Sequence, residues 1–234
     1  MESLKPVKLG ILGMGTVATG LVNIMDFNKS KVYGTVRRDL NITKVLVKNL
    51  DKKRNVNLPR EVYTRDPYEV INGDADIIVE LIGGINPAYE YIKAALNNKK
   101  HVVTANKALI AEHGEELELL AEKNKVKLMY EASVGGGIPI INTIRDNLST
   151  NEFESVFGIL NGTTNFILTQ MTDNGLDYDQ AVKEAQRLGF AEADPSSDVD
   201  GNDAAYKLSI LSSLAFGQKV HVKDIPKEGI TKIS

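Results

Sequence analysis

Short apolar runs alternate with amphipathic segments over residues 1–135 of the chain. The segments predicted to be strands are 7–12, 42–47, 76–82, 101–104 and 127–131. They are short and mostly apolar, as strands are when both faces of a parallel sheet are covered. The segments with helical spacing of apolar residues are 16–27, 87–97 and 113–124. This alternation predicts an α/β fold with a Rossmann-type doubly wound parallel sheet.

The alternation of predicted strands and helices ends at Gly135-Gly136-Gly137. We place a domain boundary there, with domains at 1–135 and 136–234. Beyond it we expect a helix from about Pro139, a strand at 153–160, and helices at 163–173, 177–188 and 202–216. Residues 218–234 resemble a connector into further structure. The second domain is therefore predicted to be α+β and incomplete at its C-terminus.

A glycine-rich loop joins the first predicted strand to the first predicted helix. It reads G-x-G-x-x-A, with Gly13, Gly15 and Ala18 at the small positions. Such a loop turns tightly, lets the backbone approach a pyrophosphate and presents free N–H groups of the helix start to it. We therefore expect dinucleotide binding at Gly13, Gly15, Thr16 and Val17. A tight turn without a ligand is the alternative.

The end of the second predicted strand bears on the choice between NAD and NADP. An acidic residue there would bind a ribose hydroxyl, and a basic one would accommodate a 2′-phosphate. Lys48 stands at the strand tip and a basic run, 52–54, follows closely. NADP is favoured, but Asp51 leaves NAD open, and the charge run also fits a solvated loop.

Composition excludes several kinds of chemistry. The chain has no cysteine, so it has no disulfide, thiolate nucleophile, iron–sulfur cluster or cysteine zinc site. Its three histidines are widely spaced, and a net charge of −3 argues against nucleic acid as the main partner. We find no secretory signal and no apolar run long enough for a membrane helix, which predicts a cytoplasmic protein without a membrane partner.

Two lysines are candidates for chemistry. Lys107 follows a predicted strand end, where doubly wound sheets place ligands, although it also fits a surface turn. Lys207 follows Asp203 by four residues, which puts the pair on one helix face. The pair is either an ordinary surface salt bridge or a proton donor oriented by a carboxylate.

Two loops before predicted helices complete the candidate site. Residues 192–203 are rich in carboxylates and would bind a cationic group such as an α-ammonium; they lack the pattern of a calcium loop. Residues 161–165 read Asn-Gly-Thr-Thr-Asn, where Thr163 or Thr164 would cap the next helix and the loop N–H groups would meet a carboxylate.

These segments resemble the homoserine dehydrogenase family, whose members interconvert aspartate 4-semialdehyde and homoserine with NAD(P). The similarity covers residues 7 to about 231, in the order and spacing of the family. Its most specific parts are NGTTN at 161–165 and AEADPSSDVDGNDAAYK at 191–207. The shared segments are 10–20, 80–84, 101–111, 131–140, 158–168 and 188–208.

The resemblance implies roles for individual residues. Lys207 matches the proton donor, Asp203 the carboxylate beside it, and Lys107 a lysine near the nicotinamide and the substrate. Lys48 stands where the family often has an arginine at the 2′-phosphate. Residues expected to hold the substrate are Glu192, Asp198, Asp203, Gly162 and Thr163. Backbone carbonyls expected to hold a monovalent cation, Na⁺ or K⁺, are those of Glu131, Val134, Gly136 and Ile138. Tyr206 replaces an arginine of many members and has no assigned role.

The family is also usually a homodimer and its members are longer than this chain. The resemblance thus implies a homodimerising, substrate-binding second domain that stops early and lacks a regulatory ACT domain. Strand 153–160 would then be partly unpaired and prone to aggregate. Two alternatives to a threonine- and methionine-pathway enzyme remain: a reductase of another aldehyde, and an inactive fragment that still binds dinucleotide.

Overall fold

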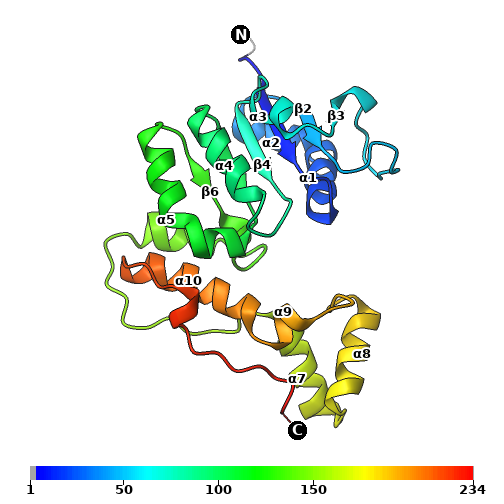
Figure 1. The fold of residues 1–234 in the computed structure, drawn as a ribbon, viewed down its shortest axis with the longest axis vertical. Coiled ribbons are helices and arrows are strands. Elements are labelled where there is room, and N and C mark those ends of the chain that lie inside the picture. Colours follow the sequence, from blue (N-terminus) through cyan, green and yellow to red (C-terminus); the bar gives the residue numbers. More distant parts are fainter. Residues whose placement is uncertain (1–3, 234) are drawn as a thin grey trace. The chain divides into compact units, whose positions relative to one another are not determined.

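Six parallel strands of the first part of the chain form one sheet in the order β3-β2-β1-β4-β5-β6 (Figure 1). Their bounds are β1 Val7–Leu12, β2 Leu40–Leu46, β3 Tyr63–Thr64, β4 Ile77–Glu80, β5 His101–Thr104 and β6 Leu128–Met129. The strand order reverses between β1 and β4, and doubly wound sheets bind ligands at the carboxyl ends of such strands. The predicted α/β class with a Rossmann-type doubly wound sheet is confirmed.

This computed structural model describes residues 4–233, and the chain divides into two compact units, Met1–Ser133 and Val134–Ser234. The division falls at the triple-glycine segment, two residues before the boundary drawn from the sequence.

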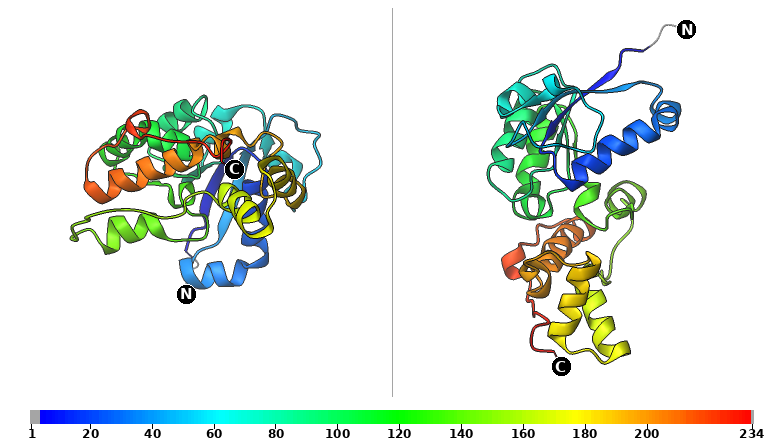
Figure 2. Two further views of the ribbon diagram at one scale, coloured as in Figure 1. Left: turned by 90° about the horizontal axis from the view of Figure 1, so that it is seen from below. Right: turned by 90° about the vertical axis from the view of Figure 1, so that its right-hand side faces the viewer.

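Helices cover both faces of the sheet. Helices α3, α4 and α5 pack along one face, and α1 packs on the other (Figure 2). Their bounds are α1 Thr16–Phe27, α2 Lys29–Val36, α3 Pro67–Ile71, α4 Ala88–Asn97 and α5 Lys107–Lys123. Because both faces are covered, successive residues Ile11 and Leu12 of β1 are both fully buried.

Several element boundaries differ from prediction. Helix α5 begins at Lys107, six residues before the predicted start, because the Asn106 side chain accepts a hydrogen bond from the Leu109 N–H at 3.2 Å and caps it. Strand β6 is limited to Leu128–Met129, because a 3₁₀ turn, Glu131–Ser133, follows it.

Two helices and one strand of the first unit were missed from the sequence, besides its 3₁₀ turns. Helix α2 has no buried residue, so it shows no apolar periodicity. Strand β3 is two residues long. Helix α3 has a readable signal, because Asp66 caps it and Pro67 is its first residue.

The second unit consists of helices and turns over its described residues, 134–233. The elements are α6 Ile140–Asn142, a π-helical turn Thr143–Asn147, α7 Gly162–Asn174, α8 Tyr178–Leu188, α9 Ser196–Val199, α10 Asn202–Phe216 and a 3₁₀ turn Val222–Asp224. Helices α7, α8 and α9 share a core of Ile167, Ala181, Ala185, Ala191 and Val199. The helix predicted from about Pro139 is present, since Pro139 directly precedes its first residue Ile140, but it is one short α-turn that widens into a π turn.

The predicted strand at 153–160 is also wrong. This segment has no regular structure, and Phe157 and Ile159 are 94% and 77% exposed. A strand exists only when a neighbour pairs with its backbone, and no strand lies among residues 134–233. The segment therefore has the apolar pattern of a strand but no partner strand among the described residues of its unit.

The C-terminal segment contacts the helices of the second unit. The Ser209 hydroxyl donates to the Val220 carbonyl at 2.6 Å, and the Ile230 N–H donates to the Val199 carbonyl at 2.8 Å. Residues 218–233 thus lie along α9 and α10.

Candidate functional site

The glycine loop between β1 and α1 is shaped for close approach. Gly13 has φ +100°, and a Cβ there would lie 2.9 Å from the Leu81 carbonyl oxygen, so only glycine fits. At Gly15 a Cβ would meet nothing within 4 Å, which leaves open space beside the start of α1. This is the arrangement in which a helix N-terminus receives a phosphate group.

A cavity of about 690 Å³ opens at this loop. It lies where β1, β2 and β4 end, the position expected for a ligand of a doubly wound sheet. Its lining residues are Gly13, Met14, Gly15, Leu46, Val47, Lys48, Asn49, Lys52, Arg54, Arg65, Pro67, Leu81, Ile82, Gly83, Asn86, Pro87 and Tyr91. Thr16 and Val17, also predicted as cofactor contacts, lie in the first turn of α1, are exposed, and do not line the cavity.

The cavity is lined by cations and by no carboxylate. Its charged lining residues are Lys48, Lys52, Arg54 and Arg65. Asp51, which could have favoured NAD, does not line it and instead pairs with Arg60 at 3.0 Å in an exposed ion pair.

Arg54 organises the loop that carries Lys48 and Lys52. Its guanidinium donates to the carbonyls of Asn49 and Lys52, both at 2.7 Å, and lies 5.1 Å from the centre of the Tyr63 ring. Its Nε is buried without a hydrogen-bond partner in the described part of the chain. The loop is thus braced from within by one side chain.

A buried hydrogen-bond network lies at the ends of β4 and β5. Glu80 is fully buried, accepts the N–H groups of Ile82 and Gly83 at 2.7 and 3.2 Å, and accepts the Thr104 hydroxyl at 2.6 Å. Thr104 in turn accepts the N–H of Asn106 at 3.0 Å. Glu80 was missed as a candidate, although a single carboxylate inside the apolar run IIVELI at 77–82 was a visible signal.

Lys107 is the first residue of α5 and is half-buried. Asn106, whose side chain caps α5, also donates to the Gly84 carbonyl at 2.6 Å. The start of α5 is therefore tied to the loop after β4, which lines the cavity. The helix start and its lysine belong to the same end of the sheet as the cavity.

The second unit contains a compact lysine–carboxylate cluster at the start of α10. The Lys207 ammonium donates to Asp203 and to the Leu160 carbonyl, both at 2.8 Å. The Lys207 and Asp203 side chains are 18% and 3% exposed. The pair is therefore largely buried and is not the exposed surface salt bridge that the sequence left open. Such a buried pair requires further hydrogen bonds to its remaining atoms.

Asn161 supplies those hydrogen bonds. Its amide nitrogen donates to Asp203 at 2.8 Å and to Asp198 at 2.7 Å, while its oxygen accepts the Thr164 N–H at 2.7 Å and caps α7. The prediction that Thr163 or Thr164 caps this helix is wrong, because Asn161 precedes both and reaches the free N–H groups first. One amide thus joins two carboxylates and a helix start.

Two of the other predicted substrate residues, Thr163 and Glu192, form hydrogen bonds elsewhere in the second unit. The Thr163 hydroxyl donates to the Phe190 carbonyl at 2.7 Å, and Gly162 is exposed at the start of α7. Glu192 is exposed, and its backbone carbonyl accepts the Gln186 amide at 3.2 Å. Tyr206 is half-buried beside Lys207 in α10.

The residues predicted to offer carbonyls to a monovalent cation fall in both units. Glu131 closes the first unit, and Val134, Gly136 and Ile138 open the second. The Ile138 carbonyl accepts the Ile140 N–H at 2.8 Å. Among residues 4–233, no group of three or more acidic or histidine side chains could hold a metal ion.

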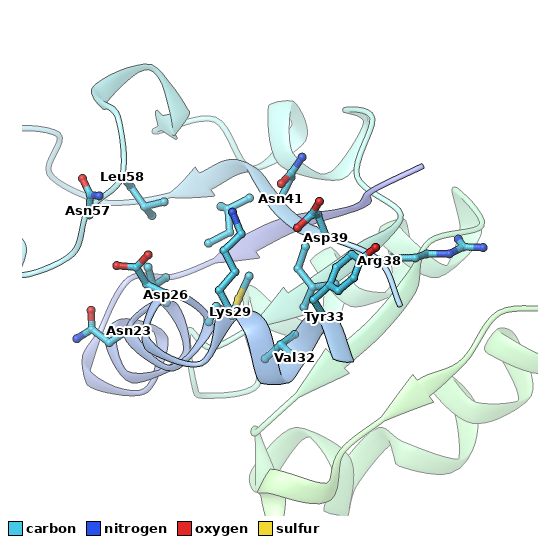
Figure 3. Close-up of a pocket in the computed structure, with 14 residues that line it drawn as sticks. Asn23, Asp26, Lys29, Val32, Tyr33, Arg38, Asp39, Asn41, Asn57 and Leu58 are labelled. Atoms are coloured by element: carbon cyan, nitrogen blue, oxygen red, sulfur yellow. The ribbon is translucent and has the colours of Figure 1, made fainter. Parts of the chain in front are cut away.

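A second cavity, of about 420 Å³, lies between α1, α2 and the start of β2. Figure 3 shows Asp26, Lys29 and Tyr33 around it, with the Arg38 side chain directed away from the others. These charged side chains are exposed to solvent. The cavity is a surface hollow outside the candidate site.

Within the described residues, no helix combines the length and the apolar character needed to cross a bilayer.

Comparisons with known proteins agree with the two-unit division. A family model described as "Homoserine dehydrogenase, NAD binding domain" matches residues 13–131, and one described as "Homoserine dehydrogenase" matches residues 139–234. A homoserine dehydrogenase of Bacillus subtilis is 47% identical over 99% of this chain and 54% of its own length. The chain spans about half the length of the curated relatives it matches.

Solved structures show the same fold. A homoserine dehydrogenase from Thiobacillus denitrificans is 44% identical with a TM-score of 0.92, over 98% of this chain and 53% of that one. A hyperthermophilic archaeal homoserine dehydrogenase in complex with NADPH is 30% identical with a TM-score of 0.82, over 99% of this chain and 75% of that one. Sequence motifs, sheet order and these matches together show that the chain belongs to the homoserine dehydrogenase family.

Proposed function

We propose that the chain carries the dinucleotide-binding and substrate-binding parts of an NAD(P)-dependent enzyme that interconverts L-aspartate 4-semialdehyde and L-homoserine. This is a step toward threonine and methionine. The observation that carries the proposal is the buried Lys207–Asp203 pair, held by Asn161 within the segments most specific to the family. In this proposal residues 1–135 bind the dinucleotide, and residues 136–234 bind substrate and contribute to a homodimer.

The first unit fits a dinucleotide. Gly15 leaves room for a pyrophosphate at the start of α1, and the cavity beside it has the volume of a cofactor site. When bound, the reduced nicotinamide supplies the hydride that adds to the aldehyde carbon. Lys107, at the start of α5, stabilises negative charge on the substrate oxygen and contacts the cofactor.

We favour NADP over NAD as the cofactor. Lys48, Lys52, Arg54 and Arg65 surround the cavity where an adenosine 2′-phosphate would lie, and no carboxylate lines it to accept a 2′-hydroxyl. Lysine binds phosphate as a point charge, so Lys48 can serve where the family often has arginine. The similarity to a structure that contains NADPH supports this preference.

Lys207 acts as the proton donor. Two of its three N–H groups are engaged by Asp203 and Leu160, which leaves one for the substrate oxygen. Asp203 holds the ammonium in place while the oxygen gains negative charge. The reaction then needs no covalent intermediate, which agrees with the absence of cysteine.

Carboxylates near this cluster would hold the cationic end of the substrate. Asp198 already lies beside Asp203 through Asn161, and Glu192 is exposed on the loop before α9. Gly162 and Thr163, in the first turn of α7, would face the substrate carboxylate, since a helix start favours an anion. The backbone carbonyls of Glu131, Val134, Gly136 and Ile138 would hold a Na⁺ or K⁺ ion.

A steady-state assay of this chain tests the proposal. We expect oxidation of NADPH, and more slowly of NADH, with aspartate 4-semialdehyde in preference to a panel of other aldehydes. Lys207→Ala should lower kcat by roughly 10²–10⁴ and leave NADPH binding intact, whereas Lys223→Ala, an exposed lysine of the same unit, should leave kcat unchanged.

Each alternative has its own outcome. Preference for another aldehyde would identify a different reductase. NADPH binding without turnover would identify an inactive fragment, and near-normal turnover by Lys207→Ala would remove the assignment of the proton donor.

A further inference from the structure

The end of β4 holds a carboxylate that the proposed mechanism does not use. Glu80 has no exposed surface and no cationic partner among its hydrogen bonds, which all come from Ile82, Gly83 and Thr104. Burying a carboxylate is unfavourable, and a buried acid normally has a partner or a function. Its three donors all belong to segments at the cavity end of the sheet.

One oxygen of Glu80 holds the loop after β4. Oε1 accepts the N–H groups of Ile82 and Gly83, and both residues line the dinucleotide cavity. The same loop lies against the glycine loop, since a Cβ at Gly13 would be 2.9 Å from the Leu81 oxygen and 3.2 Å from the Ile82 nitrogen. A small shift of the loop would therefore change the space available beside Gly13.

The other oxygen of Glu80 holds the loop after β5. Oε2 accepts the Thr104 hydroxyl at 2.6 Å, and that hydroxyl accepts the Asn106 N–H at 3.0 Å. Asn106 caps α5 and donates to the Gly84 carbonyl at 2.6 Å, which closes the network back onto the loop after β4. Lys107 follows directly, as the first residue of the helix.

We propose that Glu80 is a positioning residue that holds the two loops at the ends of β4 and β5 in the shape that binds the dinucleotide and presents Lys107. This inference rests on the proposed function, because it concerns the cofactor site of that function. A carboxylate suits the position because it only accepts hydrogen bonds, and all its neighbours here donate. Held in advance, the loops lose less freedom when the cofactor binds.

Glutamine cannot reproduce this pattern. If its oxygen accepts the N–H groups of Ile82 and Gly83, its NH₂ faces the Thr104 hydroxyl, which already accepts from Asn106 and then has no acceptor for its own hydrogen. If the amide is turned over, its NH₂ faces two N–H donors. In the first orientation the Thr104 hydroxyl hydrogen is left unpaired, and in the second the N–H groups of Ile82 and Gly83 are.

The test is a fluorescence titration of NADPH into the unmodified chain and its variants, with thermal unfolding measured in parallel. Glu80→Gln should weaken NADPH binding by about tenfold or more, the ratio expected when one charge-assisted hydrogen bond is lost. Thr104→Val removes the hydroxyl with little change of shape and should weaken binding in the same way. Thr104→Ser keeps the hydroxyl and should bind NADPH like the unmodified chain.

A matched control separates positioning from general destabilisation. Tyr130 is 3% exposed and its hydroxyl donates to Glu118 at 2.6 Å in the same unit, away from the cavity lining. Tyr130→Phe should lower the unfolding temperature but leave the Kd for NADPH unchanged.

The outcomes distinguish this inference from the function on which it rests. Absence of NADPH binding by the unmodified chain would overturn the proposed function and remove the basis of the inference with it. Normal binding by the unmodified chain and equal binding by folded Glu80→Gln would overturn the inference alone. If Glu80→Gln does not fold, equal binding by Thr104→Val and Thr104→Ser overturns it instead.

Discussion

Single polar side chains at helix starts organise both parts of the candidate site. Asn106 caps α5 in the first unit and Asn161 caps α7 in the second, and each also donates its amide to a group of the site. The sequence predicts that Lys107, Lys207 and Asp203 carry the chemistry. It did not reveal Asn161 as the residue that joins Asp198 to Asp203, because that contact spans 37 and 42 positions of the chain.

A charge reversal at Lys48 tests the cofactor preference at the residue scale. Lys48→Glu places a carboxylate in the cavity, so it should weaken NADPH binding by at least about tenfold, the effect of losing a charged hydrogen bond. NADH binding should change far less, since NADH has no 2′-phosphate. Titration of both cofactors at one fixed ionic strength measures the two Kd values.

Lys53→Glu is the matched control, because Lys53 belongs to the same exposed loop but does not line the cavity. If Lys48→Glu and Lys53→Glu weaken NADPH binding equally, the effect comes from the overall charge of the loop and not from a contact of Lys48. An equal loss for NADPH and NADH would show that Lys48 does not meet the 2′-phosphate.

A second residue-scale prediction concerns the amide of Asn161. Asn161→Asp keeps the oxygen that caps α7 but puts a third carboxylate beside Asp198 and Asp203. We expect loss of about 1–3 kcal/mol or more of stability near neutral pH, the range for an unmade buried hydrogen bond. The loss should shrink as the pH falls, because protonation of one carboxyl restores a donor.

Chemical denaturation at neutral and mildly acidic pH measures this effect. Asn165→Asp makes the same substitution at an exposed site of the same helix and should change stability little. A pH-independent loss in Asn161→Asp would show that carboxylate repulsion is not its cause.

Elements with strong apolar periodicity were predicted well, and short or unpartnered ones were not. Strands β1 and β5 and helices α1 and α10 have the predicted bounds, since their patterns are long or bounded by clear signals. Helix α2 buries no residue, so its sequence has no apolar periodicity that would predict a helix. The capping side chain of Asn106, rather than apolar spacing, decided where α5 begins.

A cluster between α4 and α5 gives a pH prediction at this scale. The hydrogen bond donated by Tyr89 at 2.6 Å, together with Lys93 at 3.1 Å, lowers the pKa of Glu116. Because the folded pKa is below the unfolded value, this stabilisation is present above the ordinary pKa of glutamate, about 4.3, and is lost as the pH falls through the folded value. The helix pair is therefore held more firmly near neutral pH than in acid.

Tyr89→Phe removes the main cause of that pKa shift. The variant should unfold at a slightly lower temperature than the unmodified chain near pH 7, with the difference shrinking by about pH 3. Tyr91 lies on the same helix, and its hydroxyl makes no hydrogen bond within residues 4–233, so Tyr91→Phe should show no such pH dependence. A Tyr89→Phe deficit that persists in acid would contradict the assignment to Glu116.

At the scale of the whole molecule, the chain folds into two units, and they differ in whether a segment with the apolar pattern of a strand has a partner strand. The first unit closes its sheet with helices on both faces. The second leaves residues 153–160 without regular structure, although they have the apolar pattern of a strand, and Phe157 and Ile159 are exposed. A segment of this kind gains most by pairing with another strand, which supports the proposed homodimer.

A charged residue at Phe157 tests that association. Phe157→Glu should shift the chain toward monomer in sedimentation velocity experiments, because a buried charge at a pairing edge is unfavourable. Phe27→Glu is the matched control, since Phe27 is 85% exposed on α1 of the first unit. Unchanged association of Phe157→Glu would rule out this segment as the contact, and irregular aggregates of the unmodified chain in place of a dimer would rule out the homodimer.

By itself the sequence determined the class of fold, the glycine loop and the types of residue available for chemistry. These depend on local patterns, namely apolar periodicity, the steric needs of glycine and the absence of thiols. The tertiary structure decided which of those residues meet. Only folding brings Glu80 to Thr104 and Asn161 to Asp203, because such contacts join side chains distant in the chain whose burial makes each unmade hydrogen bond unfavourable. Only folding, likewise, left residues 153–160 without the partner that their strand pattern requires.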